Sequence, residues 1–122
     1  MEAAAITIIF NEKDEVLLLK RTHPDGAFLG YWGFPGGETD ASETNEQAAI
    51  RETKEETNLD VQNLKFLRVS DGYVHAYTTR DFRGDLQLGI EHDCHVWKSI
   101  NELDDYKLIP GSMELIKEAT TL

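Results

Sequence analysis

Three glutamates stand close together near the middle of the chain, and their spacing limits what this segment can be. Glu52, Glu55 and Glu56 occupy positions i, i+3 and i+4. In a helix such positions share one face, so the three carboxylates leave it within one turn. Carboxylates this close repel one another unless something positive neutralises them. Hard oxygen ligands suit divalent cations such as Mg²⁺ or Mn²⁺, so the segment predicts a metal-holding helix. The simpler alternative is a solvated helix face.

The ends of this helix can also be predicted. Either Asp40 or Ser42 is expected to begin it, because Asp40 and Glu43 have the spacing of a capping box. The helix is expected to continue to about Thr57. Asn58 follows, and asparagine is the best residue after glycine for a left-handed helix C-cap.

Apolar runs bounded by turn residues predict strands on both sides of the helix. Longer strands are expected over 3–10, 15–21, 61–68, 73–79 and 92–98, with short ones around 32–34 and 86–88. The rest of 22–37 and the stretch 81–85 are expected to be loops. A short helix capped by Ser99 and Glu102 and a last helix over 112–120 complete the chain. This order predicts an α/β or α+β domain with a mixed sheet.

Composition narrows the class of protein. The 122 residues are expected to form one domain over 1–122. A net charge of −11 argues against binding a nucleic acid polymer, although cations held by carboxylates would still let an anionic ligand approach. No apolar run approaches the roughly 20 residues of a membrane span, and the N-terminus lacks a basic signal-peptide start. With Cys94 as the single cysteine, we expect a cytoplasmic protein without a membrane partner.

The spacing of residues 37–59 resembles the signature of the Nudix hydrolases. That signature reads Gly-x5-Glu-x7-Arg-Glu-U-x-Glu-Glu-x-Gly-U, where U is aliphatic. The matching residues here are Gly37, Glu43, Arg51, Glu52, Thr53, Glu55, Glu56, Asn58 and Leu59. Thr53 departs from an aliphatic position, where its methyl can still pack, and Asn58 departs from the closing glycine.

The residues before this signature extend the resemblance. Trp32-x-Phe34-Pro35-Gly36-Gly37 matches the usual lead-in of the family. The resemblance implies an α/β/α sandwich with a mixed sheet, in which the signature forms a loop, a helix and a second loop. It also implies that the carbonyl of Gly36 ligates the metal, while Gly37 lets the backbone approach a phosphate closely.

The resemblance assigns roles to the acidic cluster. Residues that match Glu52 and Glu56 are metal ligands in the family, and the residue that matches Glu55 joins through water or a second ion. Arg51 and Glu43 match a pair that shapes the loop and helix, and we interpret both as structural support of the site. An arginine beside carboxylates can orient one of them by a forked hydrogen bond.

The general base is open at this point. Glu91, His92 and Trp97 resemble a Glu-His-x-x-x-x-Trp run of several Nudix nucleotide hydrolases. In that run the glutamate binds a metal or takes a proton from water, so Glu91 is a candidate base and metal ligand. Glu55 is the other candidate base, and Asp85 and Asp93 are nearby substitutes for Glu91.

Other polar and aromatic residues carry weaker signals. Arg21 matches a position that the family often uses for phosphate contact. Trp32 can offer a ring face to a nucleobase, although packing is the simpler and favoured role for it. His92, Cys94 and His95 do not indicate zinc, because His92 and Cys94 would share one strand face while His95 points away, and no fourth ligand is evident.

The resemblance implies a Mg²⁺-dependent hydrolase, with Mn²⁺ as an alternative ion, that cleaves a nucleoside diphosphate linked to a further group. The MutT-like branch fits best, which implies hydrolysis of a nucleoside triphosphate to the monophosphate and pyrophosphate. A dinucleoside polyphosphate or ADP-ribose hydrolase is the alternative within enzymes. A catalytically silent nucleotide-sensing module is the alternative of another class. The expected partner is a small-molecule nucleotide, and the protein is expected to be a monomer or homodimer.

Overall fold

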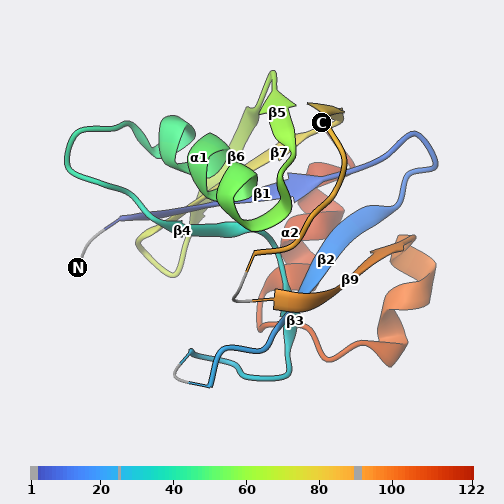
Figure 1. The fold of residues 1–122 in the computed structure, drawn as a ribbon. Helices are drawn as coiled ribbons and strands as arrows, with labels where there is room; N and C mark the ends of the chain where they lie inside the picture. The colour runs from blue at the N-terminus through green and yellow to red at the C-terminus, as the bar shows by residue number, and fades with distance from the viewer. Residues whose placement is uncertain (1–2, 25, 90–91) are drawn as a thin grey trace.

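The computed structural model describes residues 3–24, 26–89 and 92–122 and shows a mixed sheet at its centre (Figure 1). Strand β1 (Ala4–Ile9) pairs antiparallel with β4 (Gly36–Glu38) on one side and parallel with β7 (Val74–Thr79) on the other. Strand β6 (Lys65–Ser70) pairs antiparallel with β7 and completes the order β4-β1-β7-β6. The predicted mixed sheet is therefore confirmed.

A second, antiparallel sheet has the order β3-β2-β9. It consists of β3 (Trp32–Gly33), β2 (Val16–Arg21) and β9 (His92–Lys98). A third pair joins β5 (Asp60–Gln62) to β8 (Asp81–Arg83). Within the described residues, three helical segments complete the fold: α1 (Asn45–Thr57), the 3-10 helix η1 (Ile100–Asp105) and α2 (Ser112–Ala119). None of the helices in the described ranges is long and apolar enough to cross a membrane.

Strand β1 separates two layers of the core because its side chains alternate between the two sheet faces. Ala5 packs with Ala48 and Ala49 of α1 on one face. Ile8 and Phe10 face the opposite side, in a core cluster that includes residues of β2 and α2. Figure 1 shows α1 and α2 on different sides of β1. The α+β architecture predicted from the order of elements is confirmed.

The start of α1 differs from the prediction. The helix begins at Asn45, and its capping box is formed by Thr44 and Gln47: the Thr44 hydroxyl accepts the Gln47 N–H at 3.1 Å, and the Gln47 side chain accepts the Thr44 N–H at 2.8 Å. Asp40 and Glu43 form a separate turn before the helix. Asp40 with Glu43 and Thr44 with Gln47 both have the spacing of a capping box. The carboxylate of Glu43 also accepts hydrogen bonds from Arg51, as described below.

Several strand predictions need correction. The predicted strand 61–68 is two strands, β5 and β6, with Asn63 between them in the left-handed region at a φ of 54°. A loop was expected where strand β8 lies. The strand was not predicted because its partner β5 is distant in sequence. Strand β4 was missed for the same reason, since it exists through pairing with β1. The stretch 86–88 is not a strand.

The C-terminal end of α1 is closed as the sequence predicts, and a distant loop completes it. Asn58 has a φ of 66° and donates its backbone N–H to the Lys54 carbonyl. The N–H groups of Gln87 and Gly89 bond the carbonyls of Thr57 and Glu56 at 2.9 and 3.0 Å. These bonds satisfy carbonyls that a helix end otherwise leaves without a partner.

A buried pair of threonines joins α1 to the sheet. Thr53 and Thr7 are both fully buried, and the Thr53 hydroxyl donates to the Thr7 hydroxyl at 3.1 Å. Thr53 stands at the position where the Nudix signature has an aliphatic residue. The Thr7 hydroxyl lies beneath it and provides the hydrogen bond that a buried hydroxyl needs.

We expect Thr53→Val to lower the free energy of unfolding by about 1 kcal/mol, because the Thr7 hydroxyl loses the hydrogen bond that it accepts and keeps only its 3.5 Å bond to the Ala49 carbonyl. The double variant Thr7→Val/Thr53→Val should lose less than the sum of the two single variants, since no hydroxyl then lacks its partner. Urea unfolding of the four proteins measures this coupling. Strictly additive losses would show that the hydroxyl pair does not join helix and sheet.

Candidate active site at the end of helix α1

Two of the three clustered carboxylates lie against a pair of glycines. Gly36 and Gly37 belong to β4 and pair with Ile6 and Ala5 of β1, which fixes their backbone beneath α1. The Gly36 N–H donates to Glu56 Oε1 at 3.1 Å. A Cβ atom on Gly37 would stand 2.5 Å from Glu52 Cδ. The missing side chain at position 37 therefore makes the space in which the Glu52 carboxylate lies.

Solvent exposure separates the three carboxylates. Glu56 is 8% exposed, whereas the side chains of Glu52 and Glu55 are 18% and 57% exposed. The helix thus presents two sheltered carboxylates beside the glycines and one at the open surface. This arrangement suits two ligands and one group that meets water.

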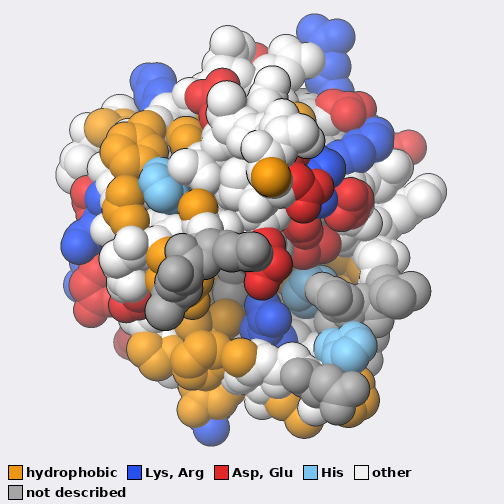
Figure 2. All heavy atoms as spheres, turned by 90° about the vertical axis from the view of Figure 1, so that its left-hand side faces the viewer, with side chains coloured by type: hydrophobic (Ala, Val, Ile, Leu, Met, Phe, Trp, Pro, Cys, Tyr) orange, Lys and Arg blue, Asp and Glu red, His pale blue; other side chains and the backbone are white. Residues whose placement is uncertain are grey.

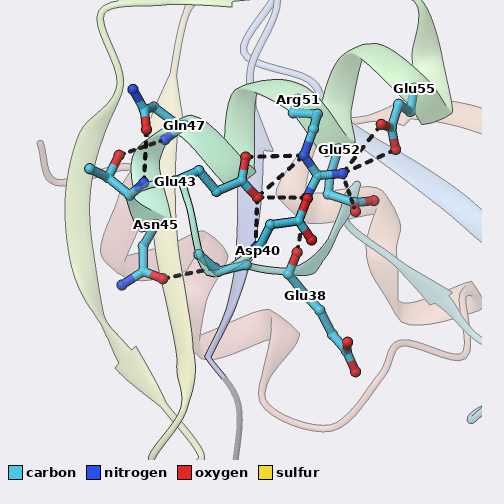
Figure 3. A network of polar contacts seen from close by, with 10 residues as sticks. Glu38, Asp40, Glu43, Asn45, Gln47, Arg51, Glu52 and Glu55 are labelled. Atoms are coloured by element: carbon cyan, nitrogen blue, oxygen red, sulfur yellow. Dashed lines mark hydrogen bonds and ion pairs between the residues drawn. The ribbon is translucent and has the colours of Figure 1, made fainter.

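The guanidinium of Arg51 lies at the centre of these acids (Figure 3). It donates to Glu52 Oε1 at 2.9 Å and to both oxygens of Glu55 at 3.2 and 3.3 Å. On its other side it makes a forked contact with Glu43, with Nη2 to Oε1 at 2.7 Å and Nε to Oε2 at 3.1 Å. The structure therefore brings the predicted pair Arg51 and Glu43 together, and Arg51 also reaches two of the clustered glutamates.

The same contacts organise the loop before the helix. Arg51 Nη2 donates to the Glu38 carbonyl at 3.0 Å, and the Asp40 carboxylate stands 3.7 Å from this nitrogen. The hydrogen bonds from Arg51 hold the pKa of the Glu43 carboxyl below its usual range, and the Glu43 carboxylate raises the pKa of Arg51. Loop 38–43 and helix α1 thus share one counter-ion.

The donors at this site fit a divalent cation in kind. Glu52, Glu56 and the Gly36 carbonyl offer hard oxygen atoms, and the absent Cβ of Gly37 leaves room for the Glu52 carboxylate. Within the described part of the chain, however, no three acidic, histidine or cysteine side chains stand together as a ready-made metal site. The geometry gives the reason: Glu52 and Glu55 turn toward Arg51, while Glu56 turns toward the Gly36 N–H. Metal ligation by these residues stays a prediction.

Two residues predicted to contact substrate have structural contacts of their own. Arg21 Nε donates to the Ala27 carbonyl at 2.8 Å, and the Gly30 N–H donates to the Arg21 carbonyl at 2.7 Å, so Arg21 anchors the loop that follows β2. Trp32 packs against the core and meets the ring of Tyr106 edge-on, with centroids 5.3 Å apart. Their roles toward a substrate stay predictions.

The candidate base Glu91 lies outside the described residues, as does the side chain of Asp93. The segment before Glu91 is tied to α1, because a Cβ on Gly89 would stand 3.0 Å from the Glu55 carbonyl. Sequence reasoning missed this contact and the contact between Arg51 and the Glu38 carbonyl. Gly89 itself was the signal in the sequence for the contact with the Glu55 carbonyl, because a glycine can indicate a close approach of two backbones.

The alternation assumed for His92, Cys94 and His95 is wrong. His92 is buried, whereas Cys94 and His95 are both exposed. The pairing of β9 with β2 shifts register between Leu19 and Arg21, and such a bulge interrupts the alternation of side chains along a strand. His92 and Cys94 therefore do not share a strand face, which was the reason given against a zinc site.

On the face turned toward the viewer in Figure 2, acidic and basic side chains gather together beside the middle of the molecule, and an apolar patch lies below them.

Comparison with known proteins identifies the family of this chain. The family model of the NUDIX domain matches residues 1–119. The chain belongs to the Nudix hydrolase family. Its predicted family membership is thereby confirmed.

Relatives of this Nudix hydrolase act on nucleotides, according to their names. The CTP pyrophosphohydrolase of Escherichia coli is 29% identical over 96% of this chain and 91% of its own length. The 8-oxo-dGTP diphosphatase of Proteus vulgaris is 37% identical over 64% of this chain and 61% of its own length. The crystal structure of a MutT NUDIX hydrolase from Burkholderia pseudomallei has the same fold, with a TM-score of 0.85 at 23% identity and coverage of 96% of each chain.

The two glycines should respond differently to an added methyl group. Gly37→Ala meets the end of the Glu52 side chain, so we expect a folded protein whose Mn²⁺ affinity falls about tenfold because Glu52 is displaced. Gly36→Ala meets the Ala5 carbonyl of β1, so it should cost about 2 kcal/mol of stability through overpacking. Urea unfolding and calorimetric Mn²⁺ titration of both variants test this. Equal behaviour of the two variants would contradict the assignment.

Proposed function

We propose that this Nudix hydrolase cleaves nucleoside triphosphates to the monophosphate and pyrophosphate, with Mg²⁺ as its cofactor and Mn²⁺ as an alternative. The observation that carries the proposal is the placement of Glu52 and Glu56 against the Gly36–Gly37 backbone at one end of α1. The match to a CTP pyrophosphohydrolase over nearly the whole chain supports the choice of substrate class.

In the proposed site, Glu52, Glu56 and the Gly36 carbonyl hold the cation. The bound cation supplies charge neutralisation on the phosphate chain and makes the attacking water more acidic. Arg21 lies at the end of β2, where its guanidinium would contact a phosphate, and Trp32 would offer its ring to the nucleobase. Glu43 and Arg51 keep loop 38–43 on the helix, so that Gly37 stays beside Glu52.

The reaction itself needs one proton acceptor. The oxygen of water attacks phosphorus, the bond between phosphorus and the bridging oxygen breaks, and the bridging oxygen leaves with the departing phosphate group. Glu55 takes the proton of the water, because it is the most exposed of the three glutamates and can exchange that proton with solvent. Glu91 is the second candidate for this step. The protein would act in the cytoplasm on a small-molecule nucleotide.

A nucleotide panel tests the proposed reaction. Pyrophosphate release from nucleoside triphosphates such as CTP and 8-oxo-dGTP should require Mg²⁺, and Glu52→Gln should lower kcat at least about a hundredfold while the melting temperature is retained. Glu46→Gln is the matched control, because Glu46 is exposed in the first turn of the same helix and should leave the rate unchanged.

Other outcomes of the panel reassign the function. If only ADP-ribose or a dinucleoside polyphosphate is hydrolysed, that compound replaces nucleoside triphosphates as the substrate, and the hydrolysis of a phosphoanhydride bond is retained. Nucleotide binding without any turnover would replace the enzyme with a sensing module. Full activity of Glu52→Gln would remove Glu52 from the site.

A further inference from the structure

The guanidinium that holds loop 38–43 also holds two of the three clustered carboxylates. We propose that Arg51 is a built-in competitor of the divalent cation: it occupies Glu52 and Glu55 in the metal-free protein and releases them when the cation binds. The proposal rests on the proposed function, because it takes Glu52 as a ligand of the cation and Glu55 as the base that has to be free of Arg51.

The two sides of the guanidinium have different partners. Among the described residues, Nη1 donates only to the helix carboxylates, to Glu52 at 2.9 Å and to Glu55 at 3.2 and 3.3 Å. Nη2 and Nε face Glu43 and the Glu38 carbonyl. Figure 3 shows this division, with Glu43 and Asp40 on one side of the guanidinium and Glu55 on the other. Arg51 can therefore give up the contacts of Nη1 and keep those of Nη2 and Nε.

The anchored side has the forked contact and a backbone partner. The Glu43 side chain is 13% exposed and makes a forked contact, and the Glu38 carbonyl belongs to strand β4. On the exchangeable side, Glu52 is 18% exposed and accepts a single hydrogen bond, and Glu55 is 57% exposed, where ion pairs are weak and easily replaced. A planar fork with several donors suits this double task, and a lysine ammonium does not.

Charge decides the direction of exchange. Arg51 offers one positive charge shared among four carboxylates, whereas a divalent cation offers two charges at a shorter distance. A cation on Glu52 and Glu56 therefore displaces Nη1 from Glu52, and Nη1 leaves Glu55 as well when it moves away. The affinity of the cation is reduced by the contacts that are lost. In the metal-free protein, the contacts of Arg51 with Glu52 and Glu55 reduce the repulsion among the glutamates of the helix.

Calorimetric titration with Mn²⁺ tests the competition in the wild type, Arg51→Gln, Glu43→Gln and the double variant. Arg51→Gln should bind Mn²⁺ about tenfold more tightly, because the competitor is gone. Glu43→Gln should bind about threefold more weakly, because Arg51 loses its anchor and holds Glu52 and Glu55 more firmly. In the Arg51→Gln background the effect of Glu43→Gln should fall to about one.

The cycle distinguishes competition from its two rivals. If Arg51 only orients Glu52, Arg51→Gln binds Mn²⁺ more weakly, which overturns the proposal. If Glu43 acts only as a nearby negative charge, Glu43→Gln weakens binding equally in both backgrounds, which also overturns it. Failure of the proposed function is separate: the wild type would then bind no Mn²⁺, or Glu52→Gln would bind it as well as the wild type.

A second measurement covers the case in which Arg51→Gln does not fold. Arg51→Lys keeps the charge but lacks the fork, so it should bind Mn²⁺ about threefold more tightly than the wild type. The rise in melting temperature on adding Mg²⁺ should also be larger for Arg51→Lys than for the wild type, because the metal-free variant starts with weaker neutralisation. An equal or smaller rise would contradict the competition.

Discussion

Repulsion among like charges at the end of α1 is the constraint around which this site is built. Three carboxylates leave one turn of helix, near a terminus where the helix dipole is already negative. The fold places Arg51 between Glu52 and Glu55 and turns Glu56 toward the Gly36 N–H. Each contact reduces the repulsion without removing the acidic groups, so the site stays available to a cation.

The same constraint explains why the surrounding backbone is glycine-rich and tied down. The Glu52 carboxylate can lie against β4 because Gly37 has no side chain, whereas a side chain at Gly36 would meet Ala5 and Ile6 of β1. Gly89 brings a third segment onto the helix end and satisfies the Glu56 carbonyl. Strand pairing, the helix terminus and the counter-ion thus hold one short stretch of helix from three directions. A Nudix hydrolase needs such rigidity, because catalysis on a phosphate chain depends on fixed positions of charge.

Residues with local causes were predictable from the sequence. The spacing of Glu52, Glu55 and Glu56 predicted a shared helix face, and Asn58 predicted the left-handed cap that the structure shows. Features with distant causes were not. Strands β4 and β8 exist through partners far away in sequence, and the bulge in β9 arises from its pairing with β2. The helix start was misplaced because a nonlocal contact with Arg51 engages Glu43, while Thr44 and Gln47 form the cap. The roles of Glu91 and Trp32 stay predictions.

The most direct test of this account is the position of Mn²⁺ in crystals of the protein grown with a non-hydrolysable nucleotide triphosphate, located by anomalous diffraction. The account predicts an anomalous peak within about 2.5 Å of oxygens of Glu52 and Glu56, beside Gly36, with Glu52 no longer bonded to Arg51. Saturating Mn²⁺ that leaves this position empty, with Glu52 and Glu55 still on the guanidinium, would contradict it.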